Sequence, residues 1–288
     1  WRFNTWVKGG NAVTKHGFEI IAENFIYNKL TNILDVSGDV RLISKEDDIV
    51  IFSDKAIYLK NEEIVLTEGN SKAINEIYEI TATNFKFKKK INVLEANKNV
   101  KFVDKKDNTF IFSDKATYLK NDEIIFTNGN TKALIDNTVN FESKDVNYSK
   151  KNQQLSSKNK SIIKDENGNT YKVDNFNYQI DKKLLKAQNV NVLSKVGESK
   201  QDDYFFSEGF FDFTKDTFVS KETKIKIHKG VFNNEKQDPR IYGSSAYGNI
   251  NTTVINKGIF TSCSLNNKCP PWSIKSEKII HDKVKKDM

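Results

Sequence analysis

Apolar and polar residues alternate along short segments through most of the chain. This period of two places apolar side chains on one face of an extended strand. The segments are rich in Ile, Val, Phe and Tyr, which favour β-structure. The pattern predicts strands at Phe18–Ile20, Ile49–Leu59, Ile64–Leu66, Tyr78–Ile80, Val93–Leu94, Phe110–Leu119, Ile124–Phe126 and Tyr171–Val173.

Clusters of Asn, Gly, Asp and Lys separate these segments, at about one cluster per ten residues. Gly, Asn and Asp tolerate positive φ, so the clusters are predicted turns. No segment shows a sustained period of 3.6 residues with helix caps. The chain is therefore expected to be all-β, a sandwich or barrel-like fold with little or no helix. The predicted turns are Asn28–Lys29, Ser37–Asp39, Glu68–Asn70, Asn128–Asn130 and Asn167–Asn169.

One segment returns almost unchanged: Ile51–Asn61 and Ile111–Asn121 are identical at ten of eleven positions, at an offset of 60 residues. The flanks keep this offset, as Phe18 does with Tyr78. A weaker similarity at an offset of 31 indicates a unit of about thirty residues, a pair of strands. Repeats of this kind bury their core by stacking on their neighbours.

Both faces of the predicted strand Ile49–Leu59 are largely apolar. A single sheet exposed on one side would alternate cleanly, whereas two sheets opposed around an apolar interior, with a second contact outside, give this pattern. Which face is interior stays open, because a slip of one residue exchanges the faces. The two sets are Val50, Phe52, Ala56 and Tyr58, and Ile49, Ile51, Ile57 and Leu59.

Composition narrows the class of protein. The 288 residues are 37% hydrophobic and 11% aromatic, which is too apolar for a disordered chain. No window reaches the ~18 apolar residues of a spanning helix, and no leader pattern precedes the first strand-like residues, so we expect a mature or trimmed chain. The net charge of +8 favours an anionic membrane surface or a phosphorylated lipid as partner. Nucleic acid is disfavoured because acids alternate with bases and only three basic residues are Arg.

All three prolines and both cysteines lie in the last fifty residues. Cys263 and Cys269 could form a redox pair, half of a metal site or a disulfide, or remain idle thiols. A zinc site needs four ligands, and His281 is the only imidazole nearby, so metal is disfavoured. The other readings stay open, and an oxidised pair would require a compartment such as the periplasm.

Three motifs near the end of the chain resemble the signature that closes the periplasmic domain of the LptD, or OstA, family. They are Phe260–Cys263, Pro270–Ile274 and Glu277–Asp282, and Asp238–Ile241 with Gly243–Ala246 fits the same region. The repeats resemble the OstA-type unit that this family shares with LptA and LptC. Together these cover essentially the whole chain; the closing motifs are specific, whereas the repeats indicate only the class.

The resemblance implies an OstA-like β-jellyroll of two antiparallel sheets in a V, with an apolar groove that conducts the acyl chains of lipopolysaccharide. It implies a place at the periplasmic face of the outer membrane and delivery from an LptA-type bridge by edge-strand pairing. It also implies an LptE-type lipoprotein partner through a transmembrane barrel absent from these residues, and hence a fragment or split product. Cys263 matches a family cysteine that forms disulfides with the barrel, so it could pair with Cys269 or with a residue beyond Met288.

We therefore expect repeats in residues 1–237, and closing strands with the cysteine signature in residues 238–288. The predicted groove residues are large apolar side chains at repeat-equivalent or nearby strand positions, and ordinary core packing is the alternative for each. They are Phe52, Tyr58, Phe85, Phe112, Tyr118, Phe126, Phe176 and Tyr178.

Nothing in the sequence favours an enzyme. His16, His228 and His281 are scattered without a nucleophile motif, and no Gly-rich phosphate loop opens a helix. Asp54 and Asp114 repeat as turn or surface residues. We expect no catalysis and no cofactor. Two other functions remain: a free-standing LptA-type bridge, which the closing signature disfavours, and a structural β-repeat or adhesin, which predicts a filled core without lipid.

Overall fold

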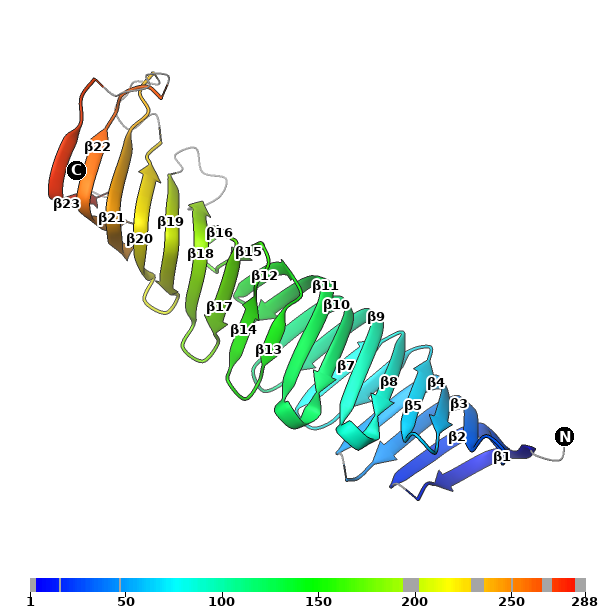
Figure 1. Ribbon diagram of the computed structural model, residues 1–288. Helices are drawn as coiled ribbons and strands as arrows, with labels where there is room; N and C mark the ends of the chain where they lie inside the picture. The colour runs from blue at the N-terminus through cyan, green and yellow to red at the C-terminus, as the bar shows by residue number, and fades with distance from the viewer. Residues whose placement is uncertain are drawn as a thin grey trace. The chain divides into compact units, whose positions relative to one another are not determined.

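The computed structural model describes residues 4–15, 17–46, 48–193, 202–228, 236–249, 251–265 and 271–282 (Figure 1). These residues form an all-β fold, as the alternation predicts. Their helical elements are two single turns, η1 (Lys89–Ile91) and η2 (Lys120–Asp122). The chain divides into two compact units: unit 1 comprises residues 1–137 with 144–152, and unit 2 comprises residues 138–143 with 153–288.

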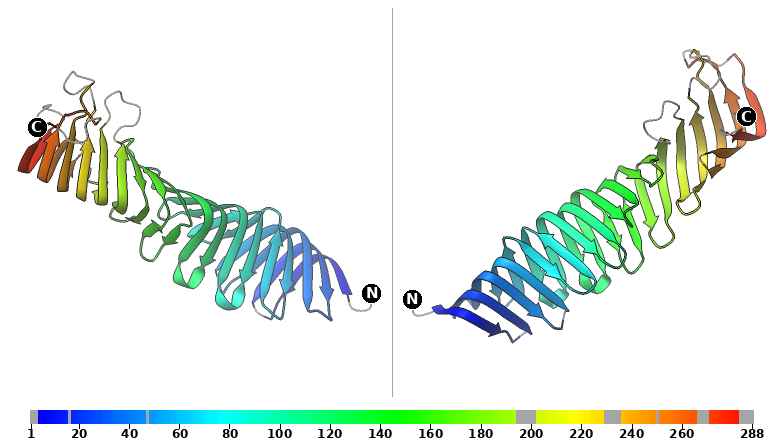
Figure 2. Two further views of the ribbon diagram at one scale, coloured as in Figure 1. Left: turned by 45° about the horizontal axis from the view of Figure 1, so that its top comes forward. Right: turned by 180° about the vertical axis from the view of Figure 1, so that it is seen from behind.

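Neighbouring strands are antiparallel in every register that the structure gives, and most follow one another along the chain (Figure 2). The strands of unit 1 are β1 (Asn4–Val13), β2 (Phe18–Asn28), β3 (Ile33–Ser44), β4 (Ile49–Leu59), β5 (Ile64–Glu68), β6 (Ser71–Ile74), β7 (Tyr78–Ala82), β8 (Asn84–Lys88), β9 (Val93–Asp104), β10 (Thr109–Leu119), β11 (Ile124–Ile135) and β13 (Asn147–Ser149).

Unit 2 contains the remaining strands. They are β12 (Val139–Lys144), β14 (Gln154–Ser157), β15 (Ser161–Lys164), β16 (Thr170–Val173), β17 (Asn175–Gln179), β18 (Leu184–Leu193), β19 (Asp203–Asp212), β20 (Thr217–Lys226), β21 (Arg240–Asn249), β22 (Thr252–Thr261) and β23 (Ile274–Asp282). The strands β20 and β21, on either side of the predicted division at residue 238, pair with each other. The proposed difference in role between residues 1–237 and 238–288 stays a prediction.

Long strands of unit 1, such as β3 and β9, are bent at their middle by an extra residue. Ser37 of β3 pairs with Lys55 and Val40 with Ser53, so Gly38 and Asp39 both stand opposite Asp54. Such a bulge bends the strand and increases its twist. Gly38 and Asp39 have φ of 82° and 45°, which is the reason for glycine at the first of them. The 60-residue repeat places the same bulge at Lys98 and Asn99 of β9, opposite Asp114 of β10.

These bends correct part of the turn prediction. Asn28–Lys29 and Asn167–Asn169 do lie at hairpin turns. Ser37–Asp39 and Asn128–Asn130, however, lie inside β3 and β11. Of Glu68–Asn70, Glu68 ends β5, and Gly69 with Asn70 forms the short break before β6. The prediction was wrong there because a bulge needs the same positive-φ residues as a hairpin turn.

Pairing on the two sides of a bend goes to different strand halves. β4 pairs with β6 through its first half and with β5 through its second half, whereas β9 pairs with β8 through its first half and with β7 through its second half. Because β5 pairs with β8 and β6 with β7, the six strands close a ring of pairings within unit 1. β4 and β9 thus each contribute one half to each of two sets of half-strands. One set contains β6 and β7, and the other contains β5 and β8.

A row of buried hydroxyl groups lines the inside of the bend. In the first repeat Thr67 Oγ1 lies 2.6 Å from Ser71 Oγ and accepts a hydrogen bond from Phe85 N at 2.9 Å, while Ser53 Oγ donates to Gly69 O at 3.0 Å. In the second repeat, Thr127, Thr131 and Ser113 occupy the equivalent positions with similar bonds. A side-chain hydroxyl replaces the ladder partner that a backbone group loses at the bulge.

Thr67→Val should lower the free energy of unfolding by about 1–3 kcal/mol, since the buried N–H of Phe85 loses its acceptor while the side-chain volume stays nearly constant. Thr117→Val, on the partly exposed face of β10, is the matched control and should change stability by less than about 0.5 kcal/mol. Chemical denaturation measures both. Equal losses for the two variants would contradict a structural role for the hydroxyl row.

Candidate functional site

In unit 1 the two sets of half-strands face one another around a shared interior. Their hairpin turns form two rims: rim A contains the turns at Glu46, Ile77 and Asp107, and rim B contains those at Asn32, Glu63, Lys89 and Asp122. Aromatic rings meet between the two sets. Tyr78, at rim A, stands edge-on to Tyr118, at rim B, with ring centroids 4.9 Å apart, and Phe18 stands likewise to Tyr58 at 5.8 Å. The apolar interior is the candidate site.

Five of the eight predicted groove residues point into an interior. Tyr58, Phe85 and Tyr118 are buried in unit 1, and Phe176 and Tyr178 are buried in unit 2, where both rings pack on Phe141. Their predicted contact with lipid stays a prediction, since the same burial also fits ordinary core packing.

The other three lie on the outer face. Phe52 is partly exposed, whereas Phe112 and Phe126 are 42% and 41% exposed. Arg41 lies over the ring of Phe52 and Lys101 over the ring of Phe112, with the cation 5.6 Å and 5.9 Å from the centroids. Phe52 and Phe112, which are equivalent in the repeat, thus each lie next to a cation on the outer face.

The expected grouping of Phe52 with Tyr58 on one face was therefore wrong. Along β4 the buried positions are Ile49, Ile51 and Ser53 before the bend, but Ala56 and Tyr58 after it. The irregularity at Asp54 shifts the alternation by one residue, so odd positions face inward before the bend and even positions after it. An unbroken period of two cannot reproduce this exchange.

Sequence reasoning missed several interior aromatics. In unit 1 they include Phe18, Tyr78, Phe102 and Tyr148, which are all buried. The repeat carried a usable signal, because Phe18 and Tyr78 are equivalent at the offset of 60 and both precede a buried aliphatic residue by two positions. Applying the apolar–polar alternation to each half-strand separately would have predicted that these aromatic side chains face inward.

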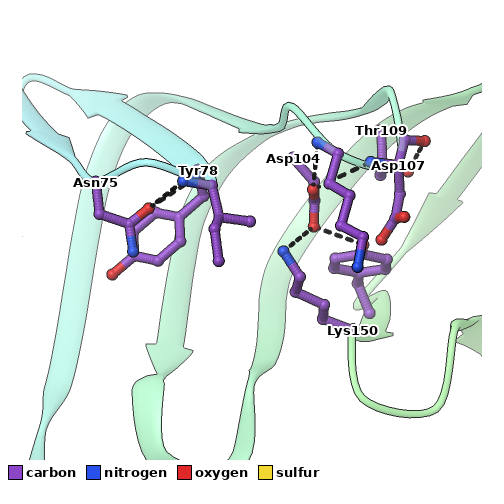
Figure 3. Close-up of polar contacts among 9 residues, drawn as sticks. Asn75, Tyr78, Asp104, Asp107, Thr109 and Lys150 are labelled. Atoms are coloured by element: carbon purple, nitrogen blue, oxygen red, sulfur yellow. Dashed lines mark hydrogen bonds and ion pairs between the residues drawn. The ribbon is translucent and has the colours of Figure 1, made fainter. Parts of the chain in front are cut away.

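A buried ion pair joins the two rims of unit 1 (Figure 3). Asp104, at the rim A end of β9, is fully buried and lies 2.8 Å from Nζ of Lys150, which follows β13 at rim B. Tyr148 OH donates to the same carboxylate oxygen at 3.1 Å, and the other oxygen accepts from Lys106 N and Asp107 N at 3.0 Å and 3.2 Å. We call this contact the latch.

A weaker contact crosses the same rims nearer the start of the chain. Lys89 Nζ lies 3.0 Å from Glu46 Oε2 and 5.5 Å from the ring centroid of Phe18. Glu46 is 77% exposed, so solvent screens this pair and its contribution is small. The carboxylate of the latch is excluded from water, so solvent and salt screen its interaction with Lys150 less than they screen the pair at Glu46.

Unit 1 contains a cavity of about 420 Å³ beside β1. Its walls are largely apolar, and the charged groups among its described lining residues are Lys15 and Lys60. Nζ of Lys60 lies 6.0 Å from the ring centroid of Tyr27, another lining residue. The apolar wall is formed mainly by Val7, Ala12, Val13, Phe25, Leu34 and Tyr58.

Unit 2 contains a second cavity, of about 440 Å³. Its floor consists of closely packed rings, such as Tyr171 and Phe211 at a centroid distance of 5.0 Å and Phe206 and Phe218 at 5.3 Å. Three hairpin turns supply its polar edge, with Asn167, Asp216 and Asn249 among the lining residues. Asn167 Nδ2 donates to Asp216 Oδ1 at 2.7 Å, although 49 residues separate them.

Described residues of three closing motifs contact one another in unit 2. Arg240 is buried and its Nη1 donates to Cys263 O at 2.6 Å and Asp238 O at 2.9 Å. Thr261 Oγ1 donates to Trp272 O at 2.9 Å, and Trp272 stands edge-on to Phe260. Cys263 is buried, whereas Cys269 lies outside the described residues, so the predicted disulfide stays a prediction.

Other candidate chemistry is sparse in the described part of the chain. Those residues hold no cluster of three or more His, Cys, Asp or Glu side chains placed to bind a metal ion. Their helical turns are too short and polar to cross a membrane as a helix. His228 Nδ1 lies 3.0 Å from Asp202 Oδ1, and His281 is buried beside β22, while His16 lies outside the described residues.

Comparison with known proteins gives no family. No protein-family model matches the chain, and no curated protein matches it either. The class that the structure itself defines is an all-β protein built from repeats, with bent strands in unit 1 and an aromatic interior and a cavity in each unit.

Lys150→Met should lower the free energy of unfolding by about 3–5 kcal/mol, because it leaves the carboxylate of Asp104 buried without its cation. The matched control is Lys186→Met, which removes the cation of an exposed pair with Glu208 and should cost less than about 1 kcal/mol. Urea denaturation compares the two. A loss of stability in Lys150→Met no larger than that in the control would show that the latch contributes no more to stability than an exposed ion pair does.

Stability should fall as the pH rises from about 10 to about 12. Burial raises the pKa of Tyr118 from 10.0 to about 12, so the folded chain keeps a proton that the unfolded chain releases. This contribution is fully present below pH 10 and lost by about pH 12, and amounts to about 2–3 kcal/mol. Tyr118→Phe should show a shallower decline in denaturation midpoints over this range. An identical decline in both proteins would refute the assignment.

Proposed function

We propose that this protein carries the acyl chains of an anionic, amphipathic lipid in its interior. The observation that carries the proposal is the cavity of unit 1, whose apolar wall has Lys15 and Lys60 as its described charged residues. An apolar pocket with a few placed polar groups is the usual form of a small-ligand site, and about 420 Å³ lies within the usual range of such sites.

The energetics favour such a ligand. Each methylene group buried against the apolar wall gains about 0.8 kcal/mol, so a chain of several methylenes offsets the cost of its own ordering. The ammonium groups of Lys15 and Lys60 attract a phosphate or carboxylate head group that stays at the solvent edge. The overall charge of +8 acts in the same direction at longer range.

The resemblance of the sequence to the LptD, or OstA, family makes lipopolysaccharide the proposed lipid. The bent strands support an OstA-like jellyroll with its two sheets in a V. The transport route, the location at the periplasmic face of the outer membrane and an LptE-type lipoprotein partner rest on the resemblance alone. A free-standing bridge of the LptA type is the alternative within this class.

Two edge strands support the proposed pairing with an LptA-type bridge. β1 pairs with β2 along one edge, and β23 pairs with β22 along one edge, with no second partner strand for either among the described residues. Trp6 of β1 is 63% exposed and Ile274 of β23 is 56% exposed. A strand of another chain could extend the sheet at such an edge.

A structural repeat without lipid is the second candidate function, and one observation favours it. The middle of unit 1 is filled by its own side chains: Phe102 lies 6.3 Å from Tyr78, 6.5 Å from Tyr118 and 5.9 Å from Tyr148, between ring centroids. Passage of an acyl chain along this stretch requires these rings to change rotamer. A structural repeat has no such requirement.

Photo-crosslinking separates the two functions. A photoreactive phenylalanine at Leu34, which lines the cavity of unit 1, should form lipopolysaccharide adducts in cells. The matched control is Ile57 of the adjacent strand β4, which points outward and is 36% exposed, and it should form none. Adducts at neither position in a folded protein would favour the structural repeat. Equal adducts at both would indicate non-specific contact with lipid and contradict the cavity.

The two lysines should contribute measurably to affinity. Replacing both Lys15 and Lys60 by Gln should weaken the binding of dodecyl phosphate by roughly tenfold, or about 1.4 kcal/mol, because each ammonium group interacts with the phosphate at the solvent edge. Isothermal titration calorimetry measures the change. The matched control is the double variant Lys182→Gln and Lys183→Gln, at an exposed turn of unit 2. It has the same net charge as the first double variant and should bind dodecyl phosphate as the unaltered protein does.

A further inference from the structure

The floor of the unit 2 cavity is an aromatic surface. Tyr204 and Phe206 lie 6.2 Å apart between ring centroids, and Phe213 lies 5.5 Å from Tyr171. Six rings take part, namely Tyr171, Tyr204, Phe206, Phe211, Phe213 and Phe218. Such a surface can pack against an alkyl chain or against the apolar face of a sugar ring.

The edge of this cavity combines amides with carboxylates. Asn167 donates to Asp216, while Asn169 Nδ2 donates to Asp165 Oδ2 at 2.8 Å, just behind the lining. Asn249 and Asn251 contribute from the turn between β21 and β22. Amides present both donors and acceptors, and carboxylates present acceptors only. A hydroxyl group, which both donates and accepts, can bond to every one of these groups.

The net charge at this edge disfavours the binding of an anion. Its described charged residues are Asp212, Asp216 and Lys215, a net charge of −1. Lys215 Nζ lies 3.6 Å from Asp212 Oδ2 and is partly neutralised by it. A hydrogen bond from the Thr214 hydroxyl lowers the pKa of Asp212, so this carboxylate stays ionised near neutral pH. The unit 1 cavity differs, with two lysines and a net charge of +2.

We propose that the unit 2 cavity binds an uncharged, hydroxyl-bearing amphiphile of the glycoside class, with its alkyl chain on the aromatic floor and its sugar hydroxyls against Asn167, Asp216 and Asn249. This rests on the proposed function in one respect, since both cavities are taken to accept alkyl chains. It adds a division of selectivity, in which unit 1 takes anionic head groups and unit 2 takes neutral sugars. A phosphate, which only accepts hydrogen bonds at its ionised oxygens, meets two carboxylates there.

Two photoreactive probes with the same chain test this selectivity. Octyl glucoside and octyl phosphate, each with a diazirine in the octyl chain, are bound to the whole chain, irradiated and mapped by peptide mass spectrometry. The glucoside should label the lining around Phe206 and Phe218 at least tenfold more than the phosphate does. In unit 1, the lining around Leu34 should show the opposite preference.

A charge-changing variant supplies the control. Asp212→Asn with Asp216→Asn keeps the shape and one acceptor oxygen of each side chain and changes the net charge of the edge from −1 to +1. Labelling of the unit 2 lining by octyl phosphate should rise at least fivefold, and labelling by the glucoside should not rise with it. An unchanged thermal melting curve confirms that the variant is folded. If its melting curve shifts, the single variant Asp216→Asn is used, with a smaller rise of about twofold.

The outcomes separate this inference from the proposed function. Equal labelling of unit 2 by both probes, or labelling of unit 1 alone, overturns the inference and leaves the proposed function standing. Labelling of neither lining by either probe overturns both. A phosphate signal that stays flat in the charge-changed variant overturns the electrostatic argument for selectivity.

Discussion

The mid-strand bend is the constraint on which the rest of the structure depends. An extra residue opposite Asp54, and again opposite Asp114, interrupts the hydrogen-bond ladder at the centre of the strand pairs β3–β4 and β9–β10 of unit 1. The interruption would leave buried backbone groups without partners, and the hydroxyl groups of Ser53, Thr67 and Ser71 fill that role. The bend in turn allows the half-strands to face each other, and this creates the interior.

Rims A and B border the interior of unit 1. The contacts between the two rims determine where the interior is closed. In unit 1 the latch between Asp104 and Lys150 closes a stretch whose interior is filled by aromatic rings. The cavity lies elsewhere in the unit, beside β1, where lysines and apolar groups meet. The same fold can thus be rigid in one stretch and able to accept a ligand in another. The different edge charges are the basis of the different ligand preferences that we propose for the two units.

The sequence predicted an all-β fold correctly because the signal is local. Alternation in Ile49–Leu59 depends on neighbouring residues only, and β4 has those bounds. The inward face could not be predicted in the same way, since the bulge at Asp54 exchanges the faces halfway along the strand. Phe52 and Phe112 therefore lie outside under Arg41 and Lys101, although their repeat equivalence was correctly recognised. The pairing of Asp104 with Lys150, 46 positions apart, depends on the way the sheet folds over and has no local signal.

Intermolecular nuclear Overhauser effects are the most direct test of the claim that the interior holds an acyl chain. Methyl groups of Leu34 and Val7, in the unit 1 cavity, should show contacts with the chain methylenes of bound dodecyl phosphate. Contacts to these methyl groups, with none to the outward methyl groups of Ile57, would establish the chain inside the fold. Contacts to Ile57 alone, with the ligand demonstrably bound, would place the lipid on the outer surface and contradict the account.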